Sequence, residues 1–243
     1  DQWEASDEYL SGNVREKLAT ARIFAENKPE FETNVRYLEK VQPKDLEASE
    51  IEVRLGATWI DPSYITAFMG ETFHTPKYYL GEEIDVKYAQ INGQWNISGK
   101  NLDSYGNSLV TSTYGTSRAN AYRLLEDALN LRDTKIYDKV DEQRVLNKKE
   151  TMLAQQKQDM IKEAFKEWIF KDIDRREDLC RKYNHLFNSI RPREYDGSHI
   201  QFVGMTPEIT LMPHQKNAVA HILYGNNTLL AHCVGAGKSA TRS

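Results

Sequence analysis

The segment from Ile84 to Gly99 constrains the fold most, because it carries the alternation of a β-hairpin on both sides of a turn. Asn92-Gly93 is the pair that favours a two-residue turn, in which both central residues take positive φ. Pairing across that turn would place Tyr88 opposite Ile97, and the apolar side chains of both arms would then share one face. An isolated two-stranded hairpin is only marginally stable in water. The segment must therefore pack against helices or pair with a further strand, for which residues 134–140 are the candidate.

Most of the remaining chain has helical periodicity. Asp61-Pro62 has the form of a helix start with proline at the first helical position, and Thr116 or Ser117 is the expected cap of a later helix. Apolar stripes predict helices near residues 7–27, 31–42, 45–55, 62–73, 117–129, 148–170, 173–187 and 213–224. We therefore expect an α+β fold that is predominantly α-helical, with a small antiparallel β-sheet.

Proline and glycine gather between residues 188 and 212, and this composition is typical of a loop. We expect a helical body over 1–190 with the hairpin at 84–99, a linker over 191–212, and a different kind of segment over 213–243. Tryptophans in the body, Trp59, Trp95 and Trp168, occupy positions on apolar faces. Core packing explains them better than stacking on bases.

Composition excludes several classes of protein. The net charge of −4 is unlike that of a small dedicated nucleic-acid binder, so any DNA contact must come from a local basic surface. Cys180 and Cys233 lie far apart, which gives neither a disulfide framework nor a zinc spacing, and the six histidines are scattered. We expect a cytoplasmic protein without a membrane segment.

The clearest chemical motif is Gly235-Ala236-Gly237-Lys238-Ser239, which follows a short apolar run expected to form a strand. Glycines let a phosphate-binding loop point several backbone N–H groups at phosphate oxygens. The lysine would then reach the β- and γ-phosphates, and Ser239 would be the ligand of Mg²⁺. The motif predicts a site for ATP and Mg²⁺.

Upstream, Leu211-Met-Pro-His-Gln215 opens a helix that ends at Gly225. A glutamine at this distance before a phosphate-binding loop is similar to the adenine-reading glutamine of superfamily 2 helicases. His232 stands where the general motif has its first glycine, a departure common in those helicases. The resemblance to such helicases implies an acidic residue where Cys233 stands, and this departure counts against nucleotide binding.

Because it carries both the glutamine and the phosphate-binding motif, the segment from Gln215 to Ser239 resembles the start of the first RecA-like lobe of a Swi/Snf-like helicase. The stretches "VQPKDLEASEIEVRLGATWIDP", "LEDALNLRDTKIYD", "VLNKKET" and "RPREYDGSHIQFVGM" resemble one family. It comprises very large proteins of conjugative plasmids and transposons that join an adenine-specific DNA methyltransferase to a Swi/Snf-like helicase. The resemblance covers nearly the whole chain and places it between those two parts.

The resemblance implies a DNA-associated spacer preceding an ATP-dependent helicase or translocase core. The expected partner is DNA, and the expected cofactors are ATP and Mg²⁺ in the parent protein. The 243 residues contain neither the Asp-Glu box that follows the loop nor an arginine finger, and phosphoryl transfer relies on both. We therefore expect an incomplete RecA-like lobe over 213–243 that does not hydrolyse ATP, with residues 228–243 poorly fixed or packed as an adventitious strand.

A run of basic residues, interleaved with acids, extends from residue 175 into the start of the linker. It is either a face that contacts DNA phosphates or an ordinary solvated helix face. Its members are Arg175, Arg176, Arg181, Lys182, Arg191 and Arg193.

A different class of function stays open. The incomplete ATPase and the acidic composition also suit a stand-alone binding protein of a mobile element, for example an inhibitor of a host defence nuclease. Such a protein would act through a protein partner, and the residues name none.

Overall fold

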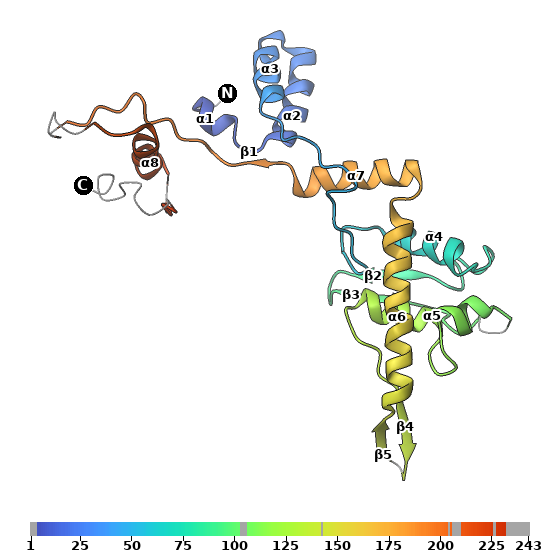
Figure 1. The fold of residues 1–243 in the computed structure, drawn as a ribbon. Helices are drawn as coiled ribbons and strands as arrows, with labels where there is room; N and C mark the ends of the chain where they lie inside the picture. Colours follow the sequence, from blue (N-terminus) through green and yellow to red (C-terminus); the bar gives the residue numbers. More distant parts are fainter. Residues whose placement is uncertain are drawn as a thin grey trace. The chain divides into compact units, whose positions relative to one another are not determined.

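A computed structural model describes residues 4–102, 106–141, 143–203, 205, 210–225 and 227–231. The chain forms two compact units, which we call the central unit (residues 45–186) and the terminal unit (residues 1–44 and 187–243). This division differs from the expected body over 1–190, because residues near both ends of that range fold together. Figure 1 shows the elements of each unit.

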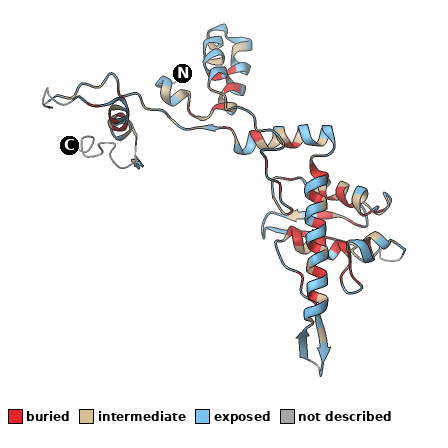
Figure 2. Cartoon of the chain, in the orientation of Figure 1, coloured by how far each residue is buried: buried red, intermediate tan, exposed pale blue. Residues whose placement is uncertain are grey.

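Helices surround a β-hairpin in the central unit. α4 (Pro62–Thr72) packs on β2 (Val86–Ala89), and α5 (Ala121–Leu129) packs on β3 (Gln94–Ile97) and along the long helix α6 (Lys148–Ile169). The other elements are a π-helical turn (Leu109–Thr113), β4 (Tyr137–Val140), β5 (Gln143–Leu146) and α7 (Ile173–Phe187). Figure 2 shows buried residues where these elements meet along α6.

Aromatic rings occupy the centre of this core. Phe68 on α4 has its ring centroid 5.2 Å from that of Phe165 and 5.4 Å from those of Phe73 and Trp168, mostly edge to face. These edge-on arrangements suit the ring quadrupoles. The helix stripes of α4 and α6 therefore supply the core, and Trp95 and Trp168 are buried as predicted.

The hairpin forms where it was predicted, but the register was wrong by two residues. Tyr88 pairs with Trp95, and Ala89 pairs with Gln94, so four residues connect the strands. Gly93 alone in this loop has positive φ (66°), and its N–H donates to the carbonyl of Ala89 at 2.9 Å. A shift of two keeps every side chain on its own face, and the predicted buried face is confirmed.

Residues 134–140 do not extend this hairpin, and the prediction of a third strand there was wrong. The N–H of Thr134 donates to Oε1 of Gln158 at 3.3 Å, and Nε2 of Gln158 donates to the carbonyl of Arg132 at 2.7 Å. The N–H of Ile136 donates to Oγ1 of Thr151 at 3.0 Å. Side chains of α6 thus take the place of a neighbouring strand, and β4 then pairs with β5.

Side chains in the last turn of α5 and at the residue that follows it bind the outer edge of β3 in the same way. Oδ1 of Asn130 accepts from the N–H of Trp95 at 2.9 Å, and its Nδ2 donates to the carbonyl of that residue at 2.9 Å. One turn earlier, Glu126 accepts from the N–H of Ile97 at 2.6 Å and forms an ion pair with Lys100. The edge of the hairpin is therefore bonded to a helix and is not open to further strands.

A helix predicted near residues 45–55 does not form. The N–H of Leu46 donates to Oδ1 of Asn184 at 2.8 Å, and Nδ2 of Asn184 donates to the carbonyl of Leu46 at 2.9 Å. These bonds to α7 fix the start of the segment, which continues through turns near residues 48–50, while Ile51 and Leu55 still reach the core. The cap of α5 is Asn120 and not Thr116 or Ser117.

The terminal unit has a small core between α2 (Val14–Asn27) and α3 (Glu32–Lys40). The helix predicted over 7–27 is interrupted, because Gly12 takes φ 72° and pairs with Arg191 in a short ladder. The ladder joins β1 (Gly12–Asn13) and β6 (Ile190–Arg191), and the remaining elements are α1 (Ser6–Tyr9), a 3₁₀ turn (Pro29–Phe31) and α8 (Pro213–Tyr224).

Within the described residues, helices predominate and three two-stranded antiparallel ladders accompany them, which confirms the α+β class. Residues 228–231 of the run before the phosphate-binding loop are not in a strand. The described helices include none that is both long and apolar enough to cross a bilayer.

Candidate nucleic-acid interface

The six basic residues predicted to contact DNA fall in both units. Four lie on α7 in the central unit, and Arg191 and Arg193 lie beyond it in the terminal unit. Arg191 donates to the carbonyl of Leu10 at 3.1 Å. Arg193 pairs with Asp7 at 2.9 Å. Both arginines thus hold the two ends of the terminal unit together.

Arg175 has a structural place on α7. Its guanidinium carbon lies 3.6 Å from the ring centroid of Trp168, and the group donates to the carbonyls of Trp168 and Ile169 at 2.9 and 3.0 Å. It thereby caps the last turn of α6, whose carbonyls lack partners within the helix. Arg181 pairs with Asp178 on the same helix, while Arg176 is exposed and Lys182 is half-buried. Arg175 and Arg181 therefore have contacts within the chain, and DNA contact by the six residues stays a prediction.

Of the predicted nucleotide site, the structure describes Gln215. Its side chain is 8% exposed, and its Oε1 accepts from the N–H of Met212 at 2.9 Å at the start of α8. Residues 235–239 of the phosphate-binding loop, including Ser239 as the magnesium ligand, lie outside the described residues. ATP and Mg²⁺ binding therefore stays a prediction.

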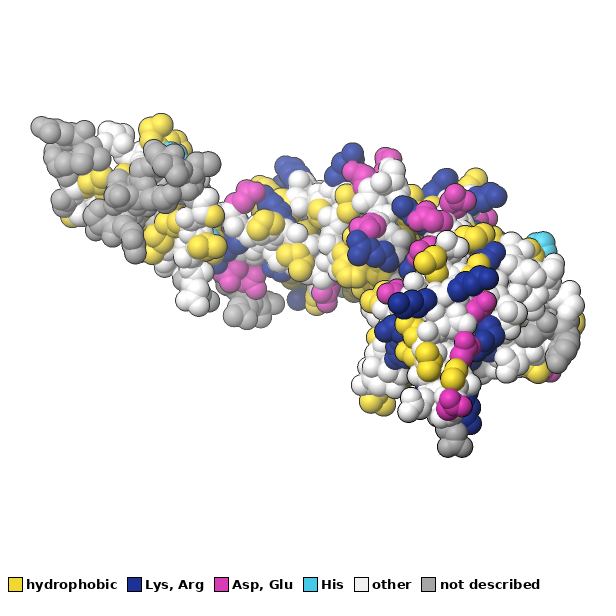
Figure 3. All heavy atoms as spheres, turned by 60° about the horizontal axis from the view of Figure 1, so that its bottom comes forward, with side chains coloured by type: hydrophobic (Ala, Val, Ile, Leu, Met, Phe, Trp, Pro, Cys, Tyr) yellow, Lys and Arg dark blue, Asp and Glu magenta, His cyan; other side chains and the backbone are white. Residues whose placement is uncertain are grey.

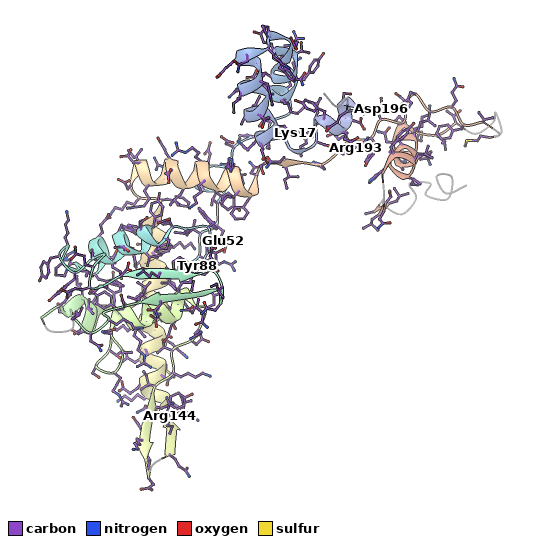
Figure 4. The ribbon with its side chains drawn as sticks, turned by 180° about the vertical axis from the view of Figure 1, so that it is seen from behind. Lys17, Glu52, Tyr88, Arg144, Arg193 and Asp196 are labelled. Atoms are coloured by element: carbon purple, nitrogen blue, oxygen red, sulfur yellow. The ribbon has the colours of Figure 1, made fainter. Side chains whose placement is uncertain are left out.

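A second hairpin, formed by β4 and β5, carries two cations on one face, and we call it the basic hairpin (Tyr137–Val140 and Gln143–Leu146). Its sequence also contains Asp138 and, between the strands, Asp141 and Glu142. Every residue of its strands is exposed except Asp138, which is half-buried. Figure 2 shows the hairpin as exposed at one end of α6, and Figure 4 labels Arg144 on it. The hairpin therefore projects from the helices of the central unit.

The pairing places two cations directly opposite each other. Lys139 pairs with Arg144, and Tyr137 pairs with Leu146 on the same face, which we call the cationic face. Within the described residues, no carboxylate lies within ion-pairing distance of either cation. Like charges directly opposite in a ladder are destabilising, by roughly 0.2–1 kcal/mol.

The acidic residue of these strands lies on the other face and is already neutralised. Asp138 accepts from Arg118 at 2.8 Å and from Nδ2 of Asn147 at 2.7 Å. The hydrogen bond from Arg118 is the main reason that the pKa of the Asp138 carboxyl lies below its usual range. The carboxylate therefore stays ionised and paired, and it does not offset the cations of the cationic face.

Two further lysines stand where local electrostatics disfavours them. Lys148 and Lys149 begin α6 directly after β5, and both are exposed. A cation in the first turn of a helix faces the positive end of the helix dipole, at a cost of roughly 0.3–1 kcal/mol. Figure 3, which turns this end of the unit toward the viewer, shows Lys and Arg side chains among hydrophobic and acidic ones.

This hairpin was not predicted, because residues 134–140 were expected to pair with the first hairpin. The signal was present in the alternation from Tyr137 to Leu146, which places Lys139 and Arg144 on one face once the turn is set at residues 141 and 142. Asp141 takes φ 47° there, as two-residue hairpin turns require of their first central residue.

A cavity of about 370 Å³ on the central unit is a weaker candidate. Its floor is apolar, with Val53, Leu55 and Ala128, but lysine, arginine, aspartate and glutamate all stand around it. The mixed charges around the cavity therefore favour neither an anionic nor a cationic ligand. The described residues contain no cluster of His, Cys, Asp or Glu suited to a metal ion.

Comparison with known proteins places the basic hairpin inside a family region. The family model described as Domain of unknown function (DUF8437) matches residues 54–189, more than half of the 243-residue chain. No curated protein and no solved structure matched the chain. The chain therefore belongs to the family described as Domain of unknown function (DUF8437).

Proposed function

We propose that this chain is a DNA-associated module of a mobile-element DNA methyltransferase and helicase, and that the basic hairpin is its DNA contact. The observation that carries the proposal is the pair of Lys139 and Arg144, which lie opposite each other and form no ion pair within the described residues. Lys148 and Lys149 add two exposed cations at the adjoining helix start. An anionic partner relieves the repulsion in both places.

The charge distribution supports DNA over a neutral protein partner. The chain as a whole has a net charge of −4, so nonspecific attraction to a polyanion is weak away from a local basic surface. DNA phosphates are the densest common array of negative charge, and cations that neutralise them release bound counterions. The nucleotide-binding motif at residues 235–239 belongs to the same proposal, as the start of the motor that the parent protein would use on DNA.

DNA binding tests the proposal directly. Fluorescence anisotropy of a short labelled duplex is measured for the wild type and for Lys139→Gln/Arg144→Gln, and we expect the variant to bind about tenfold more weakly or worse at low salt. The matched control is Arg36→Gln/Lys40→Gln, which removes the same charge from two cations that flank exposed Tyr37 on α3. We expect the control to bind as the wild type does.

Two results contradict the proposal. One is the absence of binding to any nucleic acid by the wild type. The other is equal binding by the hairpin variant and the control. If the hairpin variant instead self-associates while its DNA binding is unchanged, the cations serve to keep the open edges of the hairpin apart.

A further inference from the structure

We propose that the outer face of α6 binds the same face of a second copy of this chain, with the two helices antiparallel. We call it the pairing face, and its residues, all exposed, are Lys149, Met152, Leu153, Gln156, Met160, Glu163 and Glu167. The contact uses none of Lys139, Arg144 and Lys148, so it goes beyond the proposed function and does not depend on it.

Helix geometry places these residues on one side of α6. Steps of three or four residues lead from Lys149 to Glu167, with Met152 and Leu153 next to each other, and such steps keep side chains on one stripe of an α-helix. The buried residues of α6 face α4 and α5 on the other side. Figure 2 shows exposed and buried residues along the helix. The pairing face is therefore separate from the core of the central unit.

Apolar side chains occupy the middle of the pairing face. Met152, Leu153 and Met160 are between 40% and 63% exposed. Single apolar residues on a surface need no explanation, whereas a contiguous patch of them is typical of a contact surface. Methionine side chains adapt readily to the surface that they meet. The middle of the face therefore gains free energy when another apolar surface covers it.

The arrangement of charges identifies a second copy as the occupant. Lys149 lies seven residues before Gln156 and Glu163 lies seven after it, while Met152 and Met160 lie four residues to either side. A two-fold axis at Gln156 therefore places Lys149 opposite Glu163 of the second copy at both ends, and Met152 opposite Met160. A two-fold interface requires this kind of self-complementarity. A parallel pair would instead place Lys149 opposite Lys149.

Neighbouring lysines do not cancel the acidic end of the face. Lys162 pairs with Asp159 at 2.9 Å. Lys166 is then the one cation beside the two carboxylates of Glu163 and Glu167. This end of the pairing face therefore has a net negative charge.

The opposite end of the face is positive. Lys148 and Lys149 stand beside the single carboxylate of Glu150, and the positive end of the helix dipole adds to their charge. In an antiparallel pair, the carboxyl end of the second α6 reaches this end, and its negative dipole end favours a cation. The second copy thus relieves the unfavourable position of Lys149.

The size of the face predicts a weak dimer. Stable complexes bury about 1,200–2,000 Å² in total, and smaller contacts are typical of transient association. With three large apolar side chains from each copy, we expect a dissociation constant of about 1–100 µM. At concentrations well below that value the chain is monomeric, and there substitutions on the pairing face leave the free energy of unfolding unchanged.

Sedimentation of the full chain from about 1 to 500 µM tests the proposal. We expect the wild type to change from monomer to dimer over this range, and Met152→Glu/Met160→Glu to stay monomeric, because four carboxylates would enter the contact. Ile91→Glu is the matched control, since Ile91 is a fully exposed apolar residue in the loop between β2 and β3. We expect it to dimerise as the wild type does.

Charge reversal tests the antiparallel register. Lys149→Glu and Glu163→Lys/Glu167→Lys should each raise the dissociation constant about tenfold or more, because both ends of the pair then bring like charges together. An equal mixture of the two variants should recover the affinity of the wild type. In the mixed dimer, opposite charges meet at both ends.

A disulfide tests the position of the two-fold axis. Packed helices lie about 8–10 Å apart and their Cα atoms lie about 2.3 Å from each axis, so the two Cα atoms of residue 156 come within about 5 Å. That separation suits a disulfide. With Cys180 and Cys233 replaced by serine, oxidised Gln156→Cys should form a covalent dimer. Lys162→Cys, about 120° around the helix from residue 156, should form little.

Three results overturn the proposal. The first is a wild type that stays monomeric up to about 500 µM. The second is a dimer that Met152→Glu/Met160→Glu leaves intact. The third is a dimer that charge reversal does not weaken, or that the 162 cysteine cross-links as readily as the 156 cysteine. Circular dichroism of each variant establishes that its helical content is unchanged.

Discussion

Gln158 on α6 should be essential for holding residues 132–136, and its replacement by methionine tests this. Methionine has nearly the same size and shape, so the substitution removes the amide and leaves little cavity. The amide accepts from the N–H of Thr134 and donates to the carbonyl of Arg132. Gln158 and Thr134 are each 1% exposed, so water cannot replace the lost partner of Thr134.

The expected loss follows from these two bonds. A buried N–H left without an acceptor costs about 1–3 kcal/mol, and the net loss of the second bond is about 0.5–1.5 kcal/mol because Arg132 is exposed. We expect Gln158→Met to lower the free energy of unfolding by about 2–4 kcal/mol. Urea unfolding followed by far-UV circular dichroism gives this value if the slope with denaturant is unchanged.

Gln156→Met is the matched control, because Gln156 lies exposed on the same helix. We expect it to change the free energy of unfolding by less than about 0.5 kcal/mol. Hydrogen exchange adds a local readout, since the amide of Thr134 should exchange faster in Gln158→Met. Equal stability of the two variants, with the Thr134 amide still protected, would refute the view that α6 replaces a strand for this segment.

The remaining predictions concern a strained turn, a shifted pKa and the nucleotide motif. Leu131 follows α5 with φ 55° and its side chain is 82% exposed, so Leu131→Gly should stabilise the protein by about 1 kcal/mol, measured by thermal unfolding; a destabilised variant would show that the side chain packs. The pKa of Tyr64 is raised to about 12, mainly by burial and then by its hydrogen bond to Asp178. The folded state therefore keeps a proton that the unfolded state loses above pH 10, so stability falls as pH rises from about 10 to 12, and Tyr64→Phe should remove this part of the alkaline loss in unfolding experiments. For the P-loop, we expect no ATP hydrolysis by the 243-residue chain with or without duplex DNA, and no difference for Lys238→Ala; DNA-stimulated hydrolysis lost in the variant would show that the site is complete.

Local signals predicted several elements well. Asp61 accepts from the N–H of Ser63 at 2.9 Å and begins α4 with Pro62, as the Asp-Pro pair indicated. The long stripe from Lys148 to Ile169 forms α6, because a sustained 3.6-residue period has no competing interpretation. The sequence alone also predicts which residues of the first hairpin face the core. A register error of one residue would turn the apolar face toward solvent, so only errors in steps of two are compatible with a buried face.

The predictions of secondary structure were wrong where a polar side chain from a distant helix binds the backbone. Such a side chain takes the hydrogen bonds that a neighbouring strand or a helical turn would otherwise supply. Leu46 depends on Asn184, and Thr134 depends on Gln158. Each of these amides lies far along the chain from the backbone it binds, and its local pattern resembles that of an ordinary polar residue on a helix. The local sequence pattern carries no sign of such a partner, so the non-helical conformation of residues 45–55 and 134–136 could not be predicted.

The candidate site divides in the same way. The sequence by itself determined which residues are cationic, and it determined the phosphate-binding motif, because charge and motif spacing are properties of the chain. Tertiary structure alone decided which cations have partners: Arg175 caps α6 over Trp168, whereas Lys139 and Arg144 face each other. The physical reason is that ion pairing depends on distances of a few ångströms between residues far apart in sequence, and the packing of α6 against α5 and its neighbouring segments sets those distances.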